Sequence, residues 1–185
     1  MSETKYGYPL IFLDVDGVLN SHDFNQLAQS NTIHRNKIDL LNAIIHATDA
    51  LIVLSSAWRY HIFRGEMNLD GINWLFRSHG LMAGRPDGKG KPTNRIVGVT
   101  RPDTMIDNPK YPGNGHSEKI PMPDERGQQI ADWRTLNRHT GRYVVIDDLD
   151  LGINEAEHPF IWTCKDRGLF PFEAKQAIDH LKGIS

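Results

Sequence analysis

The sequence predicts an α/β protein in which helices cover both faces of a central, mostly parallel sheet. Two observations predict this fold class: short apolar runs alternate with segments of helical periodicity, and three of the apolar runs end directly in polar residues. Strands buried on both faces are continuously apolar, and strand–helix–strand units join parallel neighbours by right-handed crossovers. The chain has 185 residues, the size of one domain, so we expect residues 1–185 to form a single unit.

Five apolar runs are expected to be strands, at residues 10–13, 50–54, 95–99, 143–146 and 160–163. Apolar residues at helical spacing predict helices at about residues 33–48, 69–76 and 126–138, and a last helix after Pro171. Residues 83–94 and 101–124 are rich in glycine, proline and charged residues and are expected to be loops. The second loop is unusually long and is either a tail of the fold or a flap over the strand ends.

The composition is that of a globular protein, with 39% hydrophobic and 24% charged residues. A formal net charge of −2 argues against a general binder of nucleic acids or membranes, although it allows a local basic patch. The single Cys164 excludes an internal disulfide and a thiolate metal cage, and it favours a reducing compartment. No apolar stretch approaches the roughly 18 residues of a membrane helix, and no signal-peptide core is present. We therefore expect a cytoplasmic protein with no membrane contact and no obligate protein partner.

Carboxylates follow two of the predicted strands. Asp14 and Asp16 come directly after the first strand, and their spacing points both side chains the same way in an extended segment. Asp147 and Asp148 end the fourth strand, and the carboxyl ends of parallel strands meet at one edge of a sheet. Four converging carboxylates repel one another, so we expect a counterion, and oxygen-only ligands favour a hard cation, Mg²⁺, as cofactor. No paired His or Cys pattern suggests zinc, and the scattered histidines are expected mainly at the surface.

Several segments resemble motifs of the haloacid dehalogenase (HAD) superfamily of phosphohydrolases. Residues 11–20 are similar to motif I, residues 51–55 to motif II, and residues 143–148 to the acidic motif IV, so the motifs cover nearly the whole chain. Residues 55–59 and 126–133 resemble a small capless branch of the superfamily, to which HAD domains found with RNA-repair enzymes belong. The resemblance implies a three-layer, Rossmann-like HAD fold without a large cap domain.

The resemblance also implies a Mg²⁺-dependent phosphatase that works through an aspartyl-phosphate. Asp14 would be the nucleophile. Asp16 would be the general acid and base, at a position where the phosphatases of the superfamily carry aspartate and the dehalogenases do not. Mg²⁺ would be bound by the carboxylates of Asp14 and Asp147 and by the backbone carbonyl of Asp16, with Asp148 or Asp150 as a further ligand.

Ser55 and the turn at Gly17 are expected to bind phosphoryl oxygens. Members of the superfamily also hold the phosphoryl oxygens with a positively charged side chain, usually a lysine. Arg126 opens a predicted helix, whose N-terminus favours an anion, and it is preferred to Lys119 in the preceding loop as the phosphate-binding cation.

Ser56 and Arg59 follow motif II at the mouth of the predicted site and are expected to contact the substrate. Trp58 can stack on a base, but core packing at a helix start is the simpler interpretation. An uncapped site favours a phosphate on a large molecule, so we expect a nucleotide or a nucleic-acid terminal phosphate as substrate. Two alternatives stay open: a phosphatase for small metabolites such as sugar phosphates, and a non-catalytic module that binds phosphorylated ends.

Overall fold

In the computed structural model, five strands form one parallel sheet in the order β3-β2-β1-β6-β7. The structure describes residues 7–21, 32–84, 93–101, 105–107, 119–121 and 125–184. The strands of the sheet are β1 (Leu10–Leu13), β2 (Leu51–Leu54), β3 (Ile96–Val99), β6 (Tyr143–Asp147) and β7 (Phe160–Trp162). The helices are α1 (Arg35–Thr48), α2 (Tyr60–Phe63), α3 (Leu69–Ser78), α4 (Arg126–Leu136) and α5 (Pro171–Lys182). The five predicted strands and four predicted helices are present, and the predicted fold class is confirmed.

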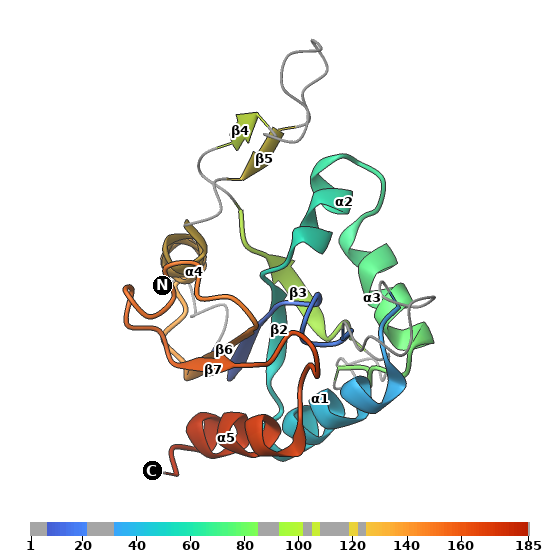
Figure 1. The fold of residues 1–185 in the computed structure, drawn as a ribbon, viewed down its shortest axis with the longest axis vertical. Helices are drawn as coiled ribbons and strands as arrows, with labels where there is room; N and C mark the ends of the chain where they lie inside the picture. Colours follow the sequence, from blue (N-terminus) through green and yellow to red (C-terminus); the bar gives the residue numbers. More distant parts are fainter. Residues whose placement is uncertain are drawn as a thin grey trace.

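Helices cover both faces of the sheet (Figure 1). Alternate residues of the central strand β1 show the two faces. Ile11 and Leu13 belong to an apolar cluster with α1, α3 and α5, whereas Leu10 and Phe12 belong to a second cluster with α4. This period of two explains why the whole run is apolar. Within the described ranges no large cap domain is added to the sheet, and no helix combines the length and the apolar character needed to cross a membrane.

The segment 101–124 is more than a loop. Its described parts form two short strands, β4 (Met105–Asp107) and β5 (Lys119–Pro121), which pair antiparallel. The expectation of an unstructured loop is wrong here, because strands of three residues are too short to show a periodicity of their own. This small sheet stands apart from the five-stranded sheet in Figure 1, and its role as a flap stays a prediction. The other predicted loop, 83–94, falls largely outside the described residues.

Backbone hydrogen bonds continue the parallel ladder one residue beyond the strands. The Asp14 N–H donates to the Ile146 carbonyl (3.0 Å), and the Ser55 N–H donates to the Leu13 carbonyl (2.8 Å). The first polar residues after β1 and β2 are therefore held side by side, and Asp147 ends β6 on the other side of β1. The sheet itself brings the predicted site residues to one edge.

Candidate active site

Three carboxylates meet where β1 and β6 end. Asp14, Asp147 and Asp148 each offer an oxygen, and these oxygens all lie within 4.8 Å of one another; we call them the acidic cluster. Asp14 and Asp147 are buried, whereas Asp148 is partly exposed. Gly17 permits this approach, because its φ is +75° and because a Cβ there would lie 2.4 Å from the carboxyl carbon of Asp148. The structure thus brings together three of the four acids predicted to bind metal.

The fourth predicted acid, Asp16, directs its carboxylate to other partners. Asn20 Nδ2 donates to Asp16 Oδ1 (2.7 Å), and the indole Nε1 of Trp58 donates to the same oxygen (3.2 Å). Asn20 is itself positioned by the Gly17 N–H, which donates to its Oδ1 (2.9 Å). Trp58 also packs edge-on against Phe76, so it combines core packing with a contact to the proposed acid. Asp16 is therefore held in one orientation beside the acidic cluster.

Arg126, the first residue of α4, lies between two of the clustered acids. Its Nη1 donates to Asp14 Oδ2 (3.1 Å) and to Asp147 Oδ2. Burial acts to lower the pKa of Arg126, but Asp14 and Asp147 outweigh burial and raise it, so the guanidinium is charged. Burial raises the pKa of Asp147, against the opposing effect of Arg126 and with a further rise from Asp14. One cation thus serves two buried carboxylates and cannot neutralise both.

Asp148 adds to this excess of negative charge. Burial, and next the charge of Asp14, raises the pKa of Asp148 to about 6. The acidic cluster has one hydrogen-bonded arginine, Arg126, and a divalent cation would offset the remaining repulsion between the three carboxylates. The donor set consists of oxygen atoms only, which suits a hard ion such as Mg²⁺ rather than zinc. The residues present fit the cofactor that the sequence predicts.

The position of Arg126 depends on close packing at the N-terminus of α4. A Cβ on Gly127 would lie 2.1 Å from the carbonyl oxygen of Gly152, so only glycine fits this contact. On the other side, His158 Nε2 lies 2.7 Å from the Gly127 carbonyl oxygen. The expectation of surface histidines is wrong for His158 and His139, because both are buried and have hydrogen-bond partners.

Arg59 is a second buried arginine near the acidic cluster, with 3% of its surface exposed. Its Nη1 donates to the Ser56 carbonyl (3.2 Å), and its Nη2 donates to Gln129 Oε1 (3.0 Å). Among the described residues no carboxylate forms an ion pair with it, and its Nε has no hydrogen-bond partner. Burial, and next repulsion by Arg126, lowers the pKa of Arg59. A guanidinium stays protonated in proteins, so Arg59 carries positive charge with which no acid among the described residues forms an ion pair, although the charge of Asp14 favours its charged form.

The two serines after β2 have different surroundings. Ser55 is buried, and its hydroxyl accepts a hydrogen bond from Thr100 Oγ1 (3.4 Å). Ser56 is also buried, and its hydroxyl accepts from the Trp58 N–H (3.4 Å), which caps the short turn leading into α2. Their contacts with phosphate and substrate stay predictions. Lys119 lies in β5, and its side chain is outside the described part of the structure.

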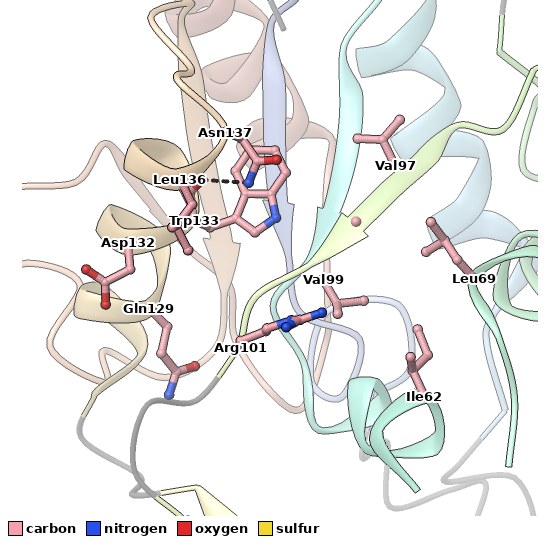
Figure 2. Close-up of a pocket in the computed structure, with 11 residues that line it drawn as sticks. Ile62, Leu69, Val97, Val99, Arg101, Gln129, Asp132, Trp133, Leu136 and Asn137 are labelled. Carbon is pink, nitrogen blue, oxygen red and sulfur yellow. Dashed lines mark hydrogen bonds between the residues drawn. The ribbon is translucent and has the colours of Figure 1, made fainter. Parts of the chain in front are cut away.

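A groove of about 470 Å³ lies along α4 and the edge strand β3 (Figure 2). Val97, Val99 and Trp133 give it apolar walls, and its volume is within the range of ligand pockets. Gln129 and Arg101, which follows β3, also line the groove, and the Arg101 side chain extends towards Val99. Because Gln129 also binds Arg59, the groove and the active site share a side chain.

Two residues that were not predicted hold predicted site residues in place. Gln129 fixes Arg59, and Thr163 Oγ1 donates to the Gly17 carbonyl (3.1 Å). Gln129 lies three residues after Arg126, on the same side of a helix, so its spacing was an available signal. No local pattern connects Thr163 to Gly17, because only the folded sheet brings them together.

The family described as "HAD domain in Swiss Army Knife RNA repair proteins" matches residues 10–174. The matched range includes all five strands of the sheet, the acidic cluster, Arg59 and Arg126. No significant match to a curated protein or to a solved structure was found.

Proposed function

Since the chain belongs to the family of HAD domains in Swiss Army Knife RNA repair proteins, we propose that it is a Mg²⁺-dependent phosphomonoester hydrolase. The observation that carries the proposal is the acidic cluster of Asp14, Asp147 and Asp148 beside the guanidinium of Arg126. Membership of the family supports phosphatase-type chemistry, and the excess of buried negative charge supports a divalent cation.

Asp14 is the proposed nucleophile. The Val15 N–H donates to its Oδ1 (2.7 Å) and Arg126 donates to its Oδ2, so the carboxylate has a fixed orientation. An oxygen of Asp14 attacks phosphorus, the bond from phosphorus to the ester oxygen breaks, and an aspartyl-phosphate forms. Mg²⁺, when bound by the acidic cluster, supplies the charge neutralisation that lets a phosphate dianion approach a carboxylate.

Asp16 is the proposed general acid and base. In the first step its carboxyl group gives a proton to the departing ester oxygen. In the second step its carboxylate accepts a proton from the water that attacks the aspartyl-phosphate, which releases inorganic phosphate and regenerates Asp14. Asn20 and Trp58 both donate to Oδ1 of Asp16, so Oδ2 is the oxygen proposed to carry the proton.

Phosphoryl oxygens are proposed to be bound by Ser55, by the backbone at Gly17 and by two arginines. Arg126 is preferred to Lys119 as the superfamily's phosphate-binding cation, because it contacts the proposed nucleophile directly. Arg59 also favours an anionic ligand. Burying a cation that has no acid partner among the described residues costs free energy, and binding of an anion would lower this cost.

The proposed substrate is a nucleotide or the terminal phosphate of a nucleic acid. Access supports this class, since no large cap covers the sheet edge within the described residues. The description of the family, which names RNA repair, supports it as well. The proposed location is the cytoplasm, and neither a membrane nor a protein partner is proposed.

The test is phosphate release from a panel of substrates, with Mg²⁺ and with a chelator. The panel contains a 3′-phosphorylated oligonucleotide, a 5′-mononucleotide and a sugar phosphate. We expect the two nucleotide substrates to be preferred, with activity abolished in Asp14→Asn and by the chelator. Asp39→Asn is the control, because Asp39 is an exposed acid on α1 paired with Arg35.

Preference for the sugar phosphate would favour the small-metabolite alternative. Tight binding of phosphorylated ends without release would favour the non-catalytic module. Turnover that persists in Asp14→Asn or under chelation would overturn the proposed mechanism.

A further inference from the structure

Trp162 is an exposed aromatic residue at the carboxyl edge of the sheet. It is the last residue of β7, lies opposite Asp147 in the strand register, and is 61% exposed. A single exposed apolar residue is common on protein surfaces, so exposure alone carries no conclusion. Trp162 differs from such residues in being held rigidly next to the acidic cluster.

Two contacts fix the indole. Its Nε1 donates to the Asp148 carbonyl (2.9 Å), and its ring stacks on Phe160 with centroids 5.8 Å apart and 21° between the ring planes. A side chain fixed in this way has already lost rotamer freedom, so a ligand that binds its exposed surface loses less entropy on binding. The indole is thus preorganised for a planar ligand.

The same segment is tied to the acidic cluster at both ends. Asp148, whose carbonyl accepts the indole hydrogen bond, supplies one of the clustered carboxylates. The residue after Trp162, Thr163, donates from its N–H to the Asp147 carbonyl (2.9 Å) and from its Oγ1 to the Gly17 carbonyl (3.1 Å). The indole therefore has a defined position relative to the phosphate site.

From this placement we infer that Trp162 is the stacking surface for the nucleobase of the nucleotide whose phosphate is removed. The inference rests on the proposed function and names the part of the substrate that is bound outside the phosphate. Every base has a flat π face, so stacking on tryptophan requires no particular base sequence. Lys165 and Arg167 lie on either side of the exposed Asp166 in the turn after Trp162 and give this turn a net positive charge for a further phosphate of a nucleic-acid chain.

Trp74 provides a matched control. It is exposed to a similar extent, 67%, but it lies on α3, and no described residue forms a hydrogen bond with its indole. Replacing either tryptophan by alanine removes the same large exposed side chain. Of these two tryptophans, only Trp162 is linked to the acidic cluster, by its hydrogen bond to the Asp148 carbonyl.

The test compares two oligonucleotides that carry the same terminal phosphate, one on an ordinary nucleotide and one on an abasic nucleotide. A 3′-phosphate series and a 5′-phosphate series are measured. We expect wild-type kcat/KM to be about tenfold higher for the substrate with the base, mainly through KM. Trp162→Ala should reduce this ratio to near one, because it lowers kcat/KM for the substrate with the base more than for the abasic substrate. Trp162→Tyr should retain most of the ratio, and Trp74→Ala should leave it unchanged.

The inference is overturned if Trp162→Ala keeps the ratio, which includes lowering kcat/KM for both substrates by the same factor. It is also overturned if Trp74→Ala reduces the ratio as much as Trp162→Ala does. Failure of the proposed function is a separate result, in which the wild-type protein hydrolyses neither substrate. In that case the tryptophan fluorescence of the wild type and of Trp162→Tyr is titrated with the same two oligonucleotides. Quenching that requires both the base and Trp162 supports the inference, and equal quenching by the two oligonucleotides overturns it.

Discussion

Arg126 and Arg59 are both buried beside the acidic cluster, yet their surroundings are opposite. Arg126 contacts two carboxylates, which raise its pKa in spite of burial. Arg59 donates to two neutral oxygens, and burial lowers its pKa. The difference agrees with the proposed function, in which the three acids bind a further cation and Arg59 binds an anion. A phosphate bound together with Mg²⁺ would supply both.

The largest effect is expected from Arg126→Leu. This change leaves Asp14 and Asp147 buried without their shared counterion, so the free energy of unfolding of the metal-free protein should fall by about 3–5 kcal/mol. We expect kcat/KM to fall by about 100-fold or more, because the proposed charged ligand of the phosphate is removed. Denaturant unfolding with and without Mg²⁺ measures the first effect, and Mg²⁺ should restore part of the lost stability. Arg126→Lys is the control that keeps the charge. A metal-free Arg126→Leu protein as stable as wild type would contradict this account.

Arg59→Met is expected to act in the opposite way on stability. It removes a buried cation without an acid partner among the described residues, so the free energy of unfolding should be unchanged or higher. Catalytic efficiency should nevertheless fall by about 10- to 100-fold, because an anion ligand is lost. Thermal unfolding and steady-state kinetics on the same preparation measure both quantities. A destabilised protein with normal kinetics would show that Arg59 serves the fold and not the substrate.

The stability of the metal-free protein at different pH values tests the charge state of the acidic cluster. Burial raises the pKa of Asp148 from an ordinary 3.8 to about 6, and it also raises that of Asp147. The metal-free folded protein therefore keeps protons that the unfolded chain has already released, so its stability should fall as pH rises from about 4 to about 6. Mg²⁺ binds the deprotonated carboxylates, and its affinity should increase over the same range with release of protons.

Thermal unfolding in a chelator across this pH range measures the first effect, with Asp148→Asn as the reference that lacks one of the titrating groups. A wild-type stability that rises more steeply with pH than that of Asp148→Asn would contradict the raised pKa.

The smallest effect is expected from Gln129→Leu, which removes the side-chain partner of Arg59 but leaves the guanidinium present. We expect kcat/KM to fall by about three- to tenfold, because the loss of one hydrogen bond leaves Arg59 less well oriented. Gln128→Leu, a substitution of the exposed neighbouring glutamine, is the control and should have no effect. Equal kinetics in the two variants would show that Arg59 needs no support from α4.

Much of the fold could be predicted from the sequence because the sheet is buried on both faces. The runs at Leu10–Leu13 and Tyr143–Asp147 are apolar at nearly every position, and both lead into acids at the edge where parallel strands end together. The strands Met105–Asp107 and Lys119–Pro121 gave no such signal, since they have three residues each and, among the described residues, pair with each other and not with the five-stranded sheet.

The site could be predicted less completely than the fold. The meeting of Asp14 with Asp147 and Asp148 was predicted because the carboxyl ends of parallel strands lie at one edge of a sheet, and the structure contains it. The contact of Arg59 with Gln129 depends on how the turn after β2 packs against α4, which is decided by tertiary packing and not by local periodicity. The stacking of Trp162 on Phe160 likewise required the structure, although their spacing in an extended segment places both on one face.

β1 is the central strand of the sheet and lies between β2 and β6. The turn that follows it, which carries the proposed catalytic residues, can therefore be completed only late in synthesis. The turn after β1 is secured by groups that the ribosome adds much later: the Leu169 N–H donates to the Val18 carbonyl (2.8 Å), and Thr163 reaches Gly17. Pairing with β6 also has to wait for residues 143–147. Loop closure over such separations is slow, so the nascent chain holds the proposed nucleophile, Asp14, in an incomplete turn until nearly all of the sheet has been made. Any hydrolytic competence would therefore emerge abruptly, at the last stage of folding.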